Sequence, residues 1–124
     1  MAKIMVVDDD EDFTNLYKTM LRAAGFEPTT VNQSVAAIEM AHLIEPDLFI
    51  IDLMMPGIDG FQLCRKLRGN PLFHTTPILI VTALNDEDNK KIAVSSGAND
   101  YLTKPFHIDE LYRRIRALLK PAGN

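Results

Sequence analysis

The chain has little of what disulfide-stabilised or membrane-spanning proteins require. It has 124 residues and a single cysteine, Cys64, so no internal disulfide can form, which is compatible with a reducing cytosol. No apolar run is long enough to cross a bilayer. The segment Met1-Ala2-Lys3 leads straight into the first expected strand, which leaves no room for a signal peptide. We therefore expect a cytoplasmic protein without membrane contacts.

Basic residues are fewer than acidic residues in this chain. The chain has 13 Lys and Arg against 17 Asp and Glu, and its net charge is −4. This balance argues against non-specific binding to nucleic acid or to anionic lipid. The 3 histidines lack the spacing of metal ligands. Repeats, low-complexity tracts and interdomain linkers are absent as well, so residues 1–124 are expected to form a single domain.

Apolar runs and helical spacing alternate along the chain. The expected strands are residues 3–7, 27–32, 48–51, 78–81 and 100–103. Each is followed by a segment with helical spacing, at residues 13–24, 34–45, 61–68, 86–97 and 108–119. The alternation predicts an α/β fold with a parallel sheet that helices cover on both faces.

The helices carry their own start signals and polar sides. Ser34 and Asp59 are candidate N-caps, and the helix at 86–97 begins with acidic residues. That fourth helix has a poor apolar face, because its apolar residues are bunched rather than spaced. The basic residues of the third and last helices are expected to face solvent: Arg65, Lys66, Arg68, Arg113, Arg114 and Arg116.

The segment Asp47–Gly60 lies at the centre of this pattern. Its apolar run, Leu48–Ile51, has no polar alternation, which is typical of a strand buried on both faces. The run ends in Asp52, and the Pro56-Gly57 pair then breaks the strand. Asp52 is therefore expected at the carboxyl end of a central strand, where open α/β sheets bind their ligands.

Polar residues stand at the ends of four predicted strands: Asp8 and Asp9, Asp52, Thr82, and Lys104. In a parallel sheet these ends share one edge, so the side chains converge. Three neighbouring carboxylates repel one another unless a cation is present, and oxygen ligands in an open site suit Mg²⁺. Lys104 and Thr82 are better placed to grip an anion. The set fits phosphoryl transfer, with Asp52 as the nucleophile that forms an aspartyl phosphate.

Four motifs make the whole chain resemble the receiver domain of two-component response regulators. They are VVDD at 6–9, DLMMPGIDG at 52–60, VTA at 81–83 and GANDYLTKPF at 97–106. Each motif alone is weak, but four in this order on these elements are highly specific. No leftover segment is longer than the tail at 121–124. The resemblance implies a flavodoxin-like (βα)5 fold, with a five-stranded parallel sheet of order 2-1-3-4-5 and five helices on both faces.

The resemblance also implies roles for the acidic residues. Asp52 matches the phosphoacceptor of the family, and Asp8 and Asp9 match the acidic pair that holds Mg²⁺ together with Asp52. Met54 matches the position whose backbone carbonyl completes the metal shell. The expected cofactor is therefore Mg²⁺.

Three further residues match the family's switch. Thr82 corresponds to the hydroxyl that binds the phosphoryl group, and Lys104 to the lysine that pairs with it. Tyr101 corresponds to the aromatic residue that turns inward when Thr82 moves toward the phosphate. A cis peptide bond between Lys104 and Pro105 is also expected from the family.

The function implied is a phosphorylation-dependent signalling switch in a two-component phosphorelay. The chain would accept a phosphoryl group from a histidine kinase or a histidine phosphotransfer protein. It would signal through its fourth helix, fifth strand and last helix to an unknown partner or effector domain, with a possible phosphorylation-dependent homodimer. It is expected to catalyse only its own phosphotransfer and autodephosphorylation, and not to bind nucleic acid directly.

Three alternatives stay open at this stage. A degenerate receiver would bind a partner without phosphorylation, although the complete acidic site argues against it. An aspartyl-phosphate phosphatase of the haloacid dehalogenase type would need a second Asp two residues after the nucleophile, where Met54 stands. A flavodoxin-like FMN binder would need a phosphate-binding loop after the first strand, and the acidic run at 8–12 would repel a phosphate instead.

Overall fold

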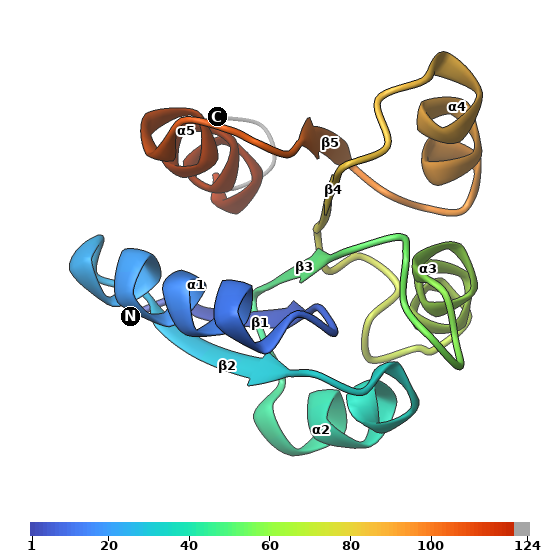
Figure 1. Cartoon of the computed structure of the whole chain (residues 1–124). Coiled ribbons are helices and arrows are strands. Elements are labelled where there is room, and N and C mark those ends of the chain that lie inside the picture. Colours follow the sequence, from blue (N-terminus) through green and yellow to red (C-terminus); the bar gives the residue numbers. More distant parts are fainter. Residues whose placement is uncertain (121–124) are drawn as a thin grey trace.

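The computed structural model describes residues 1–120, along which strands and helices alternate (Figure 1). The strands are β1 Lys3–Val7, β2 Glu27–Val31, β3 Leu48–Ile51, β4 Ile78–Thr82 and β5 Asp100–Thr103. The helices are α1 Glu11–Ala23, α2 Ala37–Ile44, α3 Gly60–Arg68, α4 Glu87–Ser95 and α5 Ile108–Leu119, with a 3-10 turn, η1 Ser34–Ala36, before α2. None of the helices in this part of the chain is both long and apolar enough to cross a membrane.

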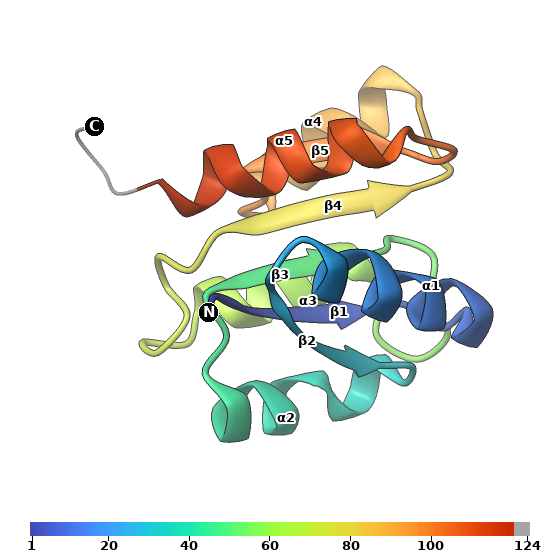
Figure 2. The same ribbon diagram turned by 90° about the vertical axis from the view of Figure 1, so that its left-hand side faces the viewer.

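The strands form one parallel sheet in the order β2-β1-β3-β4-β5, which confirms the predicted fold. Helices α1 and α5 cover one face, and α2, α3 and α4 cover the other (Figure 1). In the view from the side, α5 lies in front of β5, and α1 lies in front of β3 and β1 (Figure 2). All strands run the same way, so their carboxyl ends meet at a single edge of the sheet.

Each face of the sheet has its own apolar core, because successive side chains of a strand point to opposite faces. In β3, Leu48 and Ile50 join the cluster under α1 and α5, whereas Phe49 and Ile51 join the cluster under α2 and α3. Every residue of β3 is buried. This two-sided burial is why the strand has no polar residue before Asp52.

Acidic N-caps begin three of the helices. The carboxylates of Asp10, Asp59 and Asp86 accept hydrogen bonds from the backbone N–H groups of Phe13, Gln62 and Asn89. Such caps satisfy amide groups that the first helical turn leaves without partners. The predicted cap of the third helix and the acidic start of the fourth are thereby confirmed.

The predicted N-cap of the second helix is wrong. Ser34 begins η1 instead, and α2 begins three residues later, at Ala37, without a side-chain cap. The buried Ser34 hydroxyl donates to the carbonyl oxygen of Pro56 at 3.0 Å and accepts from the N–H of Ile58 at 3.1 Å. Ser34 therefore fixes the loop that follows Asp52 rather than the helix next to it in sequence.

Arg68 is half-buried, which corrects its predicted position on the solvated side of the third helix. Its guanidinium donates to the carbonyl oxygens of Gly97, Phe73 and Thr76 at 2.9, 2.9 and 2.6 Å. It also donates to Oδ1 of Asn99 at 2.7 Å. Burial lowers the pKa of Arg68. These bonds join α3 to the turn between α4 and β5 and to the loop before β4.

Arg114 is also less exposed than predicted. Its Nη1 donates to Oδ1 of Asp100 at 2.7 Å and to the carbonyl oxygen of Tyr101 at 3.0 Å, and its Nε donates to Oε1 of Glu110 at 2.9 Å. Charged pairs of this kind at a surface contribute about 1 kcal/mol or less. Their main consequence is geometric, because they tie α5 to β5.

Native Cys64 is expected to resist thiol reagents. The side chain is fully buried, and burial raises the pKa of its thiol to about 12. Because the thiolate is the reactive form, labelling at neutral pH should require unfolding. The measurement is the rate of modification by a maleimide in buffer and in urea, followed by intact mass. Rapid stoichiometric labelling in buffer would show that α3 opens readily around this residue.

Replacing Gly60 with alanine is expected to destabilise the fold and disturb Asp52. A Cβ at Gly60 would meet the backbone carbonyl oxygen of Asp52 and lie 2.7 Å from Cα of Leu53. Backbone on both sides has to move, which costs about 1–3 kcal/mol. Urea denaturation of Gly60→Ala measures the loss. The control is Gly69→Ala, whose Cβ would meet only ordinary contacts from 3.5 Å outward; equal stability of both variants would contradict the expectation.

Candidate functional site

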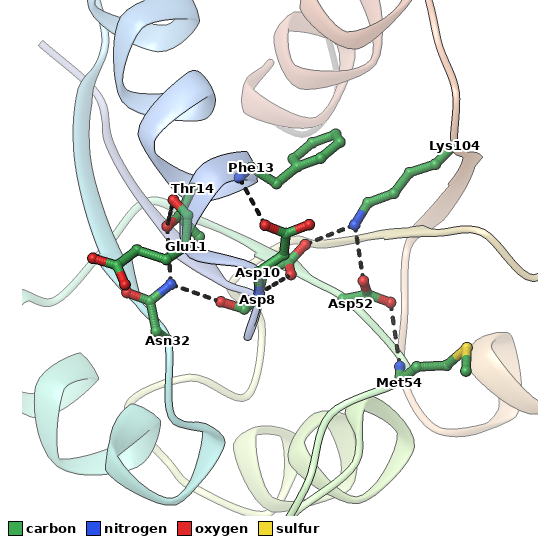
Figure 3. Close-up of polar contacts among 9 residues, drawn as sticks. All are labelled: Asp8, Asp10, Glu11, Phe13, Thr14, Asn32, Asp52, Met54 and Lys104. Atoms are coloured by element: carbon green, nitrogen blue, oxygen red, sulfur yellow. Dashed lines mark hydrogen bonds and ion pairs between the residues drawn. The ribbon is translucent and has the colours of Figure 1, made fainter.

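The carboxyl ends of β1, β3 and β5 bring three charged side chains together (Figure 3). The ammonium nitrogen of Lys104 lies 2.8 Å from Oδ2 of Asp8 and 2.9 Å from Oδ2 of Asp52. These residues are 96 and 52 positions apart from Lys104 in the sequence. Sequence reasoning placed all three at this edge, and the structure brings them into one ion-paired group.

Asp8 is held by the elements around it. Its carboxylate Oδ1 accepts from the N–H of Asp10 at 2.9 Å, and its backbone carbonyl accepts from Nδ2 of Asn32 at 3.0 Å. The same Nδ2 lies 2.9 Å from Oγ1 of Thr14. Burial raises the pKa of the Asp8 carboxyl, although the bond from Lys104 opposes that shift. The network fixes the acidic loop between β1 and α1.

Asp52 ends the central strand and is only 8% exposed. Its backbone N–H donates to the carbonyl oxygen of Val7 at 3.1 Å, which continues the pairing of β3 with β1 by one residue. Its Oδ1 accepts from the N–H of Met54 at 3.2 Å, and its Oδ2 accepts from Lys104. One carboxylate oxygen is therefore held by the backbone and the other by a cation.

Lys104 enters the site from the end of β5. The peptide bond between Lys104 and Pro105 is cis, as predicted. Burial lowers the pKa of Lys104, but the hydrogen bonds from its ammonium group to Asp8 and Asp52 outweigh burial, and the net shift is upward. The side chain is therefore cationic at neutral pH. The Phe13 ring lies against it, with 4.2 Å between Nζ and the ring centroid.

Within residues 1–120, neither of the two predicted switch residues bonds to the ion-paired group through its side-chain hydroxyl. Thr82 is fully buried at the end of β4, and its Oγ1 has no hydrogen-bond partner within residues 1–120. A buried hydroxyl without a partner costs about 1–3 kcal/mol. The hydroxyl of half-buried Tyr101 donates to the backbone carbonyl of Leu84, which joins β5 to the loop before α4. Burial raises the pKa of Tyr101.

The proposed metal ligands are only partly assembled. Asp8 and Asp52 converge on one cation, whereas Asp9 is exposed. Among residues 1–120, no three His, Cys, Asp or Glu side chains form a group compact enough to hold a metal. The donors are nevertheless carboxylate oxygens, which suit Mg²⁺. The Lys104 ammonium pairs with both Asp8 and Asp52 and so places a positive charge between them, as a bound divalent ion would.

Sequence reasoning missed Asn32, Thr14 and Phe13. The sequence predicts Asn32 as the last residue of the second strand, but β2 ends at Val31, and the Asn32 side chain donates to the Asp8 carbonyl and to Thr14. Its place at the carboxyl end of a parallel strand was the available signal. Phe13 had no comparable signal, because its helical spacing is equally typical of a core residue.

Comparison with known proteins gives a consistent result. A sequence model described as the response regulator receiver domain matches residues 4–116. The chain is 38% identical over 120 residues to the DNA-binding dual master transcriptional regulator RpaA of Synechocystis sp.. That alignment covers 97% of this chain and 50% of RpaA, so the chain spans about half the length of this relative.

Solved structures share the fold over nearly the whole chain. The chemotaxis protein CheY4 of Vibrio cholerae matches with a TM-score of 0.92 at 29% identity, covering 96% of this chain and 99% of that one. The receiver domain of sensor histidine kinase PA1611 from Pseudomonas aeruginosa matches with a TM-score of 0.88 at 28% identity, covering 95% and 97%. That domain was solved with a magnesium ion coordinated in its active site cleft.

Proposed function

The chain belongs to the response regulator receiver domain family, and from this membership we propose that it is a signalling switch phosphorylated on Asp52. The observation that carries the proposal is the position of the Asp52 carboxylate. It ends the central strand, is nearly buried, and is paired with Lys104 beside Asp8. A buried carboxylate next to a fixed cation can approach an anionic phosphoryl donor that it would otherwise repel.

In the proposed reaction, one oxygen of Asp52 attacks the phosphorus atom of a phosphohistidine. A P–O bond forms, and the P–N bond breaks with its electron pair passing to the imidazole of the donor. Lys104 then pairs with an oxygen of the transferred group, and the Thr82 hydroxyl donates to another. Mg²⁺, held by Asp8, Asp9, Asp52 and the Met54 carbonyl, would supply charge neutralisation on the phosphoryl oxygens.

The proposed output passes through the loop between β4 and α4. Thr82 is the last residue of β4, Leu84 lies in the loop, and the Tyr101 hydroxyl is bonded to the Leu84 carbonyl. Movement of Thr82 toward a phosphoryl group would therefore shift the loop that leads into α4, and with it the position of α4. The surface formed by α4, β5 and α5 is the proposed contact for an effector domain, another protein or a second phosphorylated copy.

We propose that residues 1–124 act as one regulatory unit with no external substrate. The donor would be a histidine kinase or a histidine phosphotransfer protein, and the chain would catalyse only phosphotransfer to itself and loss of that group. We propose that the chain meets its phosphoryl donor in the cytoplasm.

A receiver that binds a partner without phosphorylation is the second candidate. The observation in its favour is that the Lys104 ammonium pairs with both Asp8 and Asp52, so the two carboxylates share a cationic partner from the chain itself. Incubation with acetyl phosphate and Mg²⁺, followed by intact mass, separates the two functions. Gain of one phosphoryl group supports the switch, and no gain at any Mg²⁺ concentration would support the second candidate.

A further inference from the structure

The Lys104 ammonium has three neighbours rather than the two that phosphoryl transfer accounts for. Two of its donors point to Asp8 and Asp52, and the face of the Phe13 ring lies 4.2 Å from Nζ. In Figure 3 the Phe13 ring and Asp52 flank the ammonium group. The Lys104 side chain is only 15% exposed, so this cation meets the ring in a largely water-free setting. A cation over an aromatic face is attracted by the negative charge of that face.

The Phe13 ring is itself fixed. Its backbone N–H donates to the Asp10 cap at 3.1 Å, which holds the first turn of α1. Its ring packs against Tyr17, with 5.0 Å between centroids, and against the edge of Phe106 at 6.0 Å. Tyr17 is fully buried, and its hydroxyl has no hydrogen-bond partner within the described residues. The Tyr17 ring therefore contributes by its shape, as a wall behind Phe13.

We infer that Phe13 is a positioning residue that keeps the Lys104 ammonium over the phosphoacceptor while its carboxylate partners change. The inference rests on the proposed function. When Asp52 carries a phosphoryl group, the bond from Lys104 to its Oδ2 has to be replaced. A divalent ion would also compete with Lys104 for Asp8. The ring contact depends on neither partner and persists through both changes.

The chemistry of lysine makes such a support useful. Its charge sits at the end of four rotatable methylene groups, and its strongly hydrated ammonium is drawn toward water when its ion pairs are disrupted. A leucine or methionine at position 13 would fill space without attracting the cation. An aromatic face attracts it without a formal negative charge that would repel the incoming phosphoryl group.

The test removes the charge on the ring face without changing the shape of the ring. Trifluorophenylalanine is incorporated at position 13, and the phosphorylation rate by acetyl phosphate is measured at saturating Mg²⁺. We expect a rate about three- to tenfold below that of wild type. The matched control carries the same substitution at Phe106, which packs on Phe13, whereas Nζ lies over the Phe13 ring; this control should keep the wild-type rate. Phe13→Leu should be phosphorylated more slowly than wild type. Phe13→Tyr, which keeps the aromatic face, should be phosphorylated at the wild-type rate.

A second readout does not depend on turnover. The ε-methylene protons of Lys104 should be shifted upfield by the Phe13 ring in NMR spectra, and should stay so after Mg²⁺ and beryllofluoride are added. Loss of the shift in that complex would overturn the inference. Equal slowing by fluorination at both positions would overturn it too, because packing alone would then explain the effect.

The two levels of the proposal fail differently. If the wild-type chain takes up phosphoryl groups normally and fluorination of Phe13 leaves the rate unchanged, only the role of Phe13 is overturned. If the wild-type chain takes up none, the proposed function fails and the role of Phe13 fails with it.

Discussion

Asp52→Asn is expected to abolish phosphorylation by acetyl phosphate. The wild-type carboxylate attacks phosphorus while the bond to the leaving acetate breaks, and an amide is too weak a nucleophile to do so. The substitution keeps the size of the side chain and the acceptor for the Met54 N–H. It removes the charge that pairs with Lys104. The measurement is intact mass after incubation with Mg²⁺, with peptide mapping of any modified residue.

The matched control is Asp109→Asn, an exposed acidic residue in the first turn of α5. This variant should gain one phosphoryl group at the wild-type rate. Chelation of Mg²⁺ should suppress uptake by both wild type and control. If Asp52→Asn still gained a phosphoryl group at the wild-type rate on another residue, the assignment of the nucleophile would be wrong.

Replacing Met54 with Asn and Leu84 with Glu together should shorten the lifetime of the phosphorylated state, by about tenfold or more. Hydrolysis requires water to approach phosphorus opposite the Asp52 oxygen. We expect these two side chains to flank that approach, because Met54 is two residues after Asp52 and Leu84 is two residues after Thr82. Met54 is 60% exposed and Leu84 is half-buried, and both are apolar. They cannot orient water, whereas an amide and a carboxylate can, and positioning of a reactant lowers barriers by several kcal/mol.

The measurement is the decay of the phosphorylated form by intact mass after removal of the donor. The control is Met54→Leu with Leu84→Met, which keeps both side chains apolar and should leave the lifetime unchanged. Both pairs retain the Leu84 backbone carbonyl that Tyr101 contacts. A polar pair that decays as slowly as the wild type, or more slowly, would show that other groups set the lifetime.

The sheet and the charged group were predictable from the sequence because their causes are local or topological. Strands buried on both faces leave unbroken apolar runs, so β1 and β3 were predicted with the bounds that the structure gives. Once the strands are parallel, their carboxyl ends share an edge. Asp8, Asp52 and Lys104 follow from that rule, without knowledge of any distance.

Bonds from side chains to distant backbone groups could not be predicted, because they produce no pattern in the sequence. Arg68 follows the helical period of an exposed residue, yet most of its acceptors are carbonyl oxygens, which every residue has. The Ser34 hydroxyl likewise serves the backbone of a loop 22 to 24 residues away. A side-chain pattern shows which residues prefer water, but it does not show which distant backbone groups need a donor.

The bonds of Arg68 fix α4 at one end only, the carboxyl end of the helix. Its carboxyl end is anchored, since Arg68 binds the carbonyl of Gly97 and Arg65 donates to the buried Ser96 hydroxyl at 3.1 Å. Its one buried side chain, Ala93, lies near that anchored end. Any tilt of the helix therefore pivots near Gly97 and is largest at its amino end, about 15 Å away at 1.5 Å per residue. A partner that binds the amino-terminal half of α4 and tilts it would therefore strain the bond from Tyr101 to the Leu84 carbonyl in the preceding loop. The bond from Arg68 to the Gly97 carbonyl would stay in place.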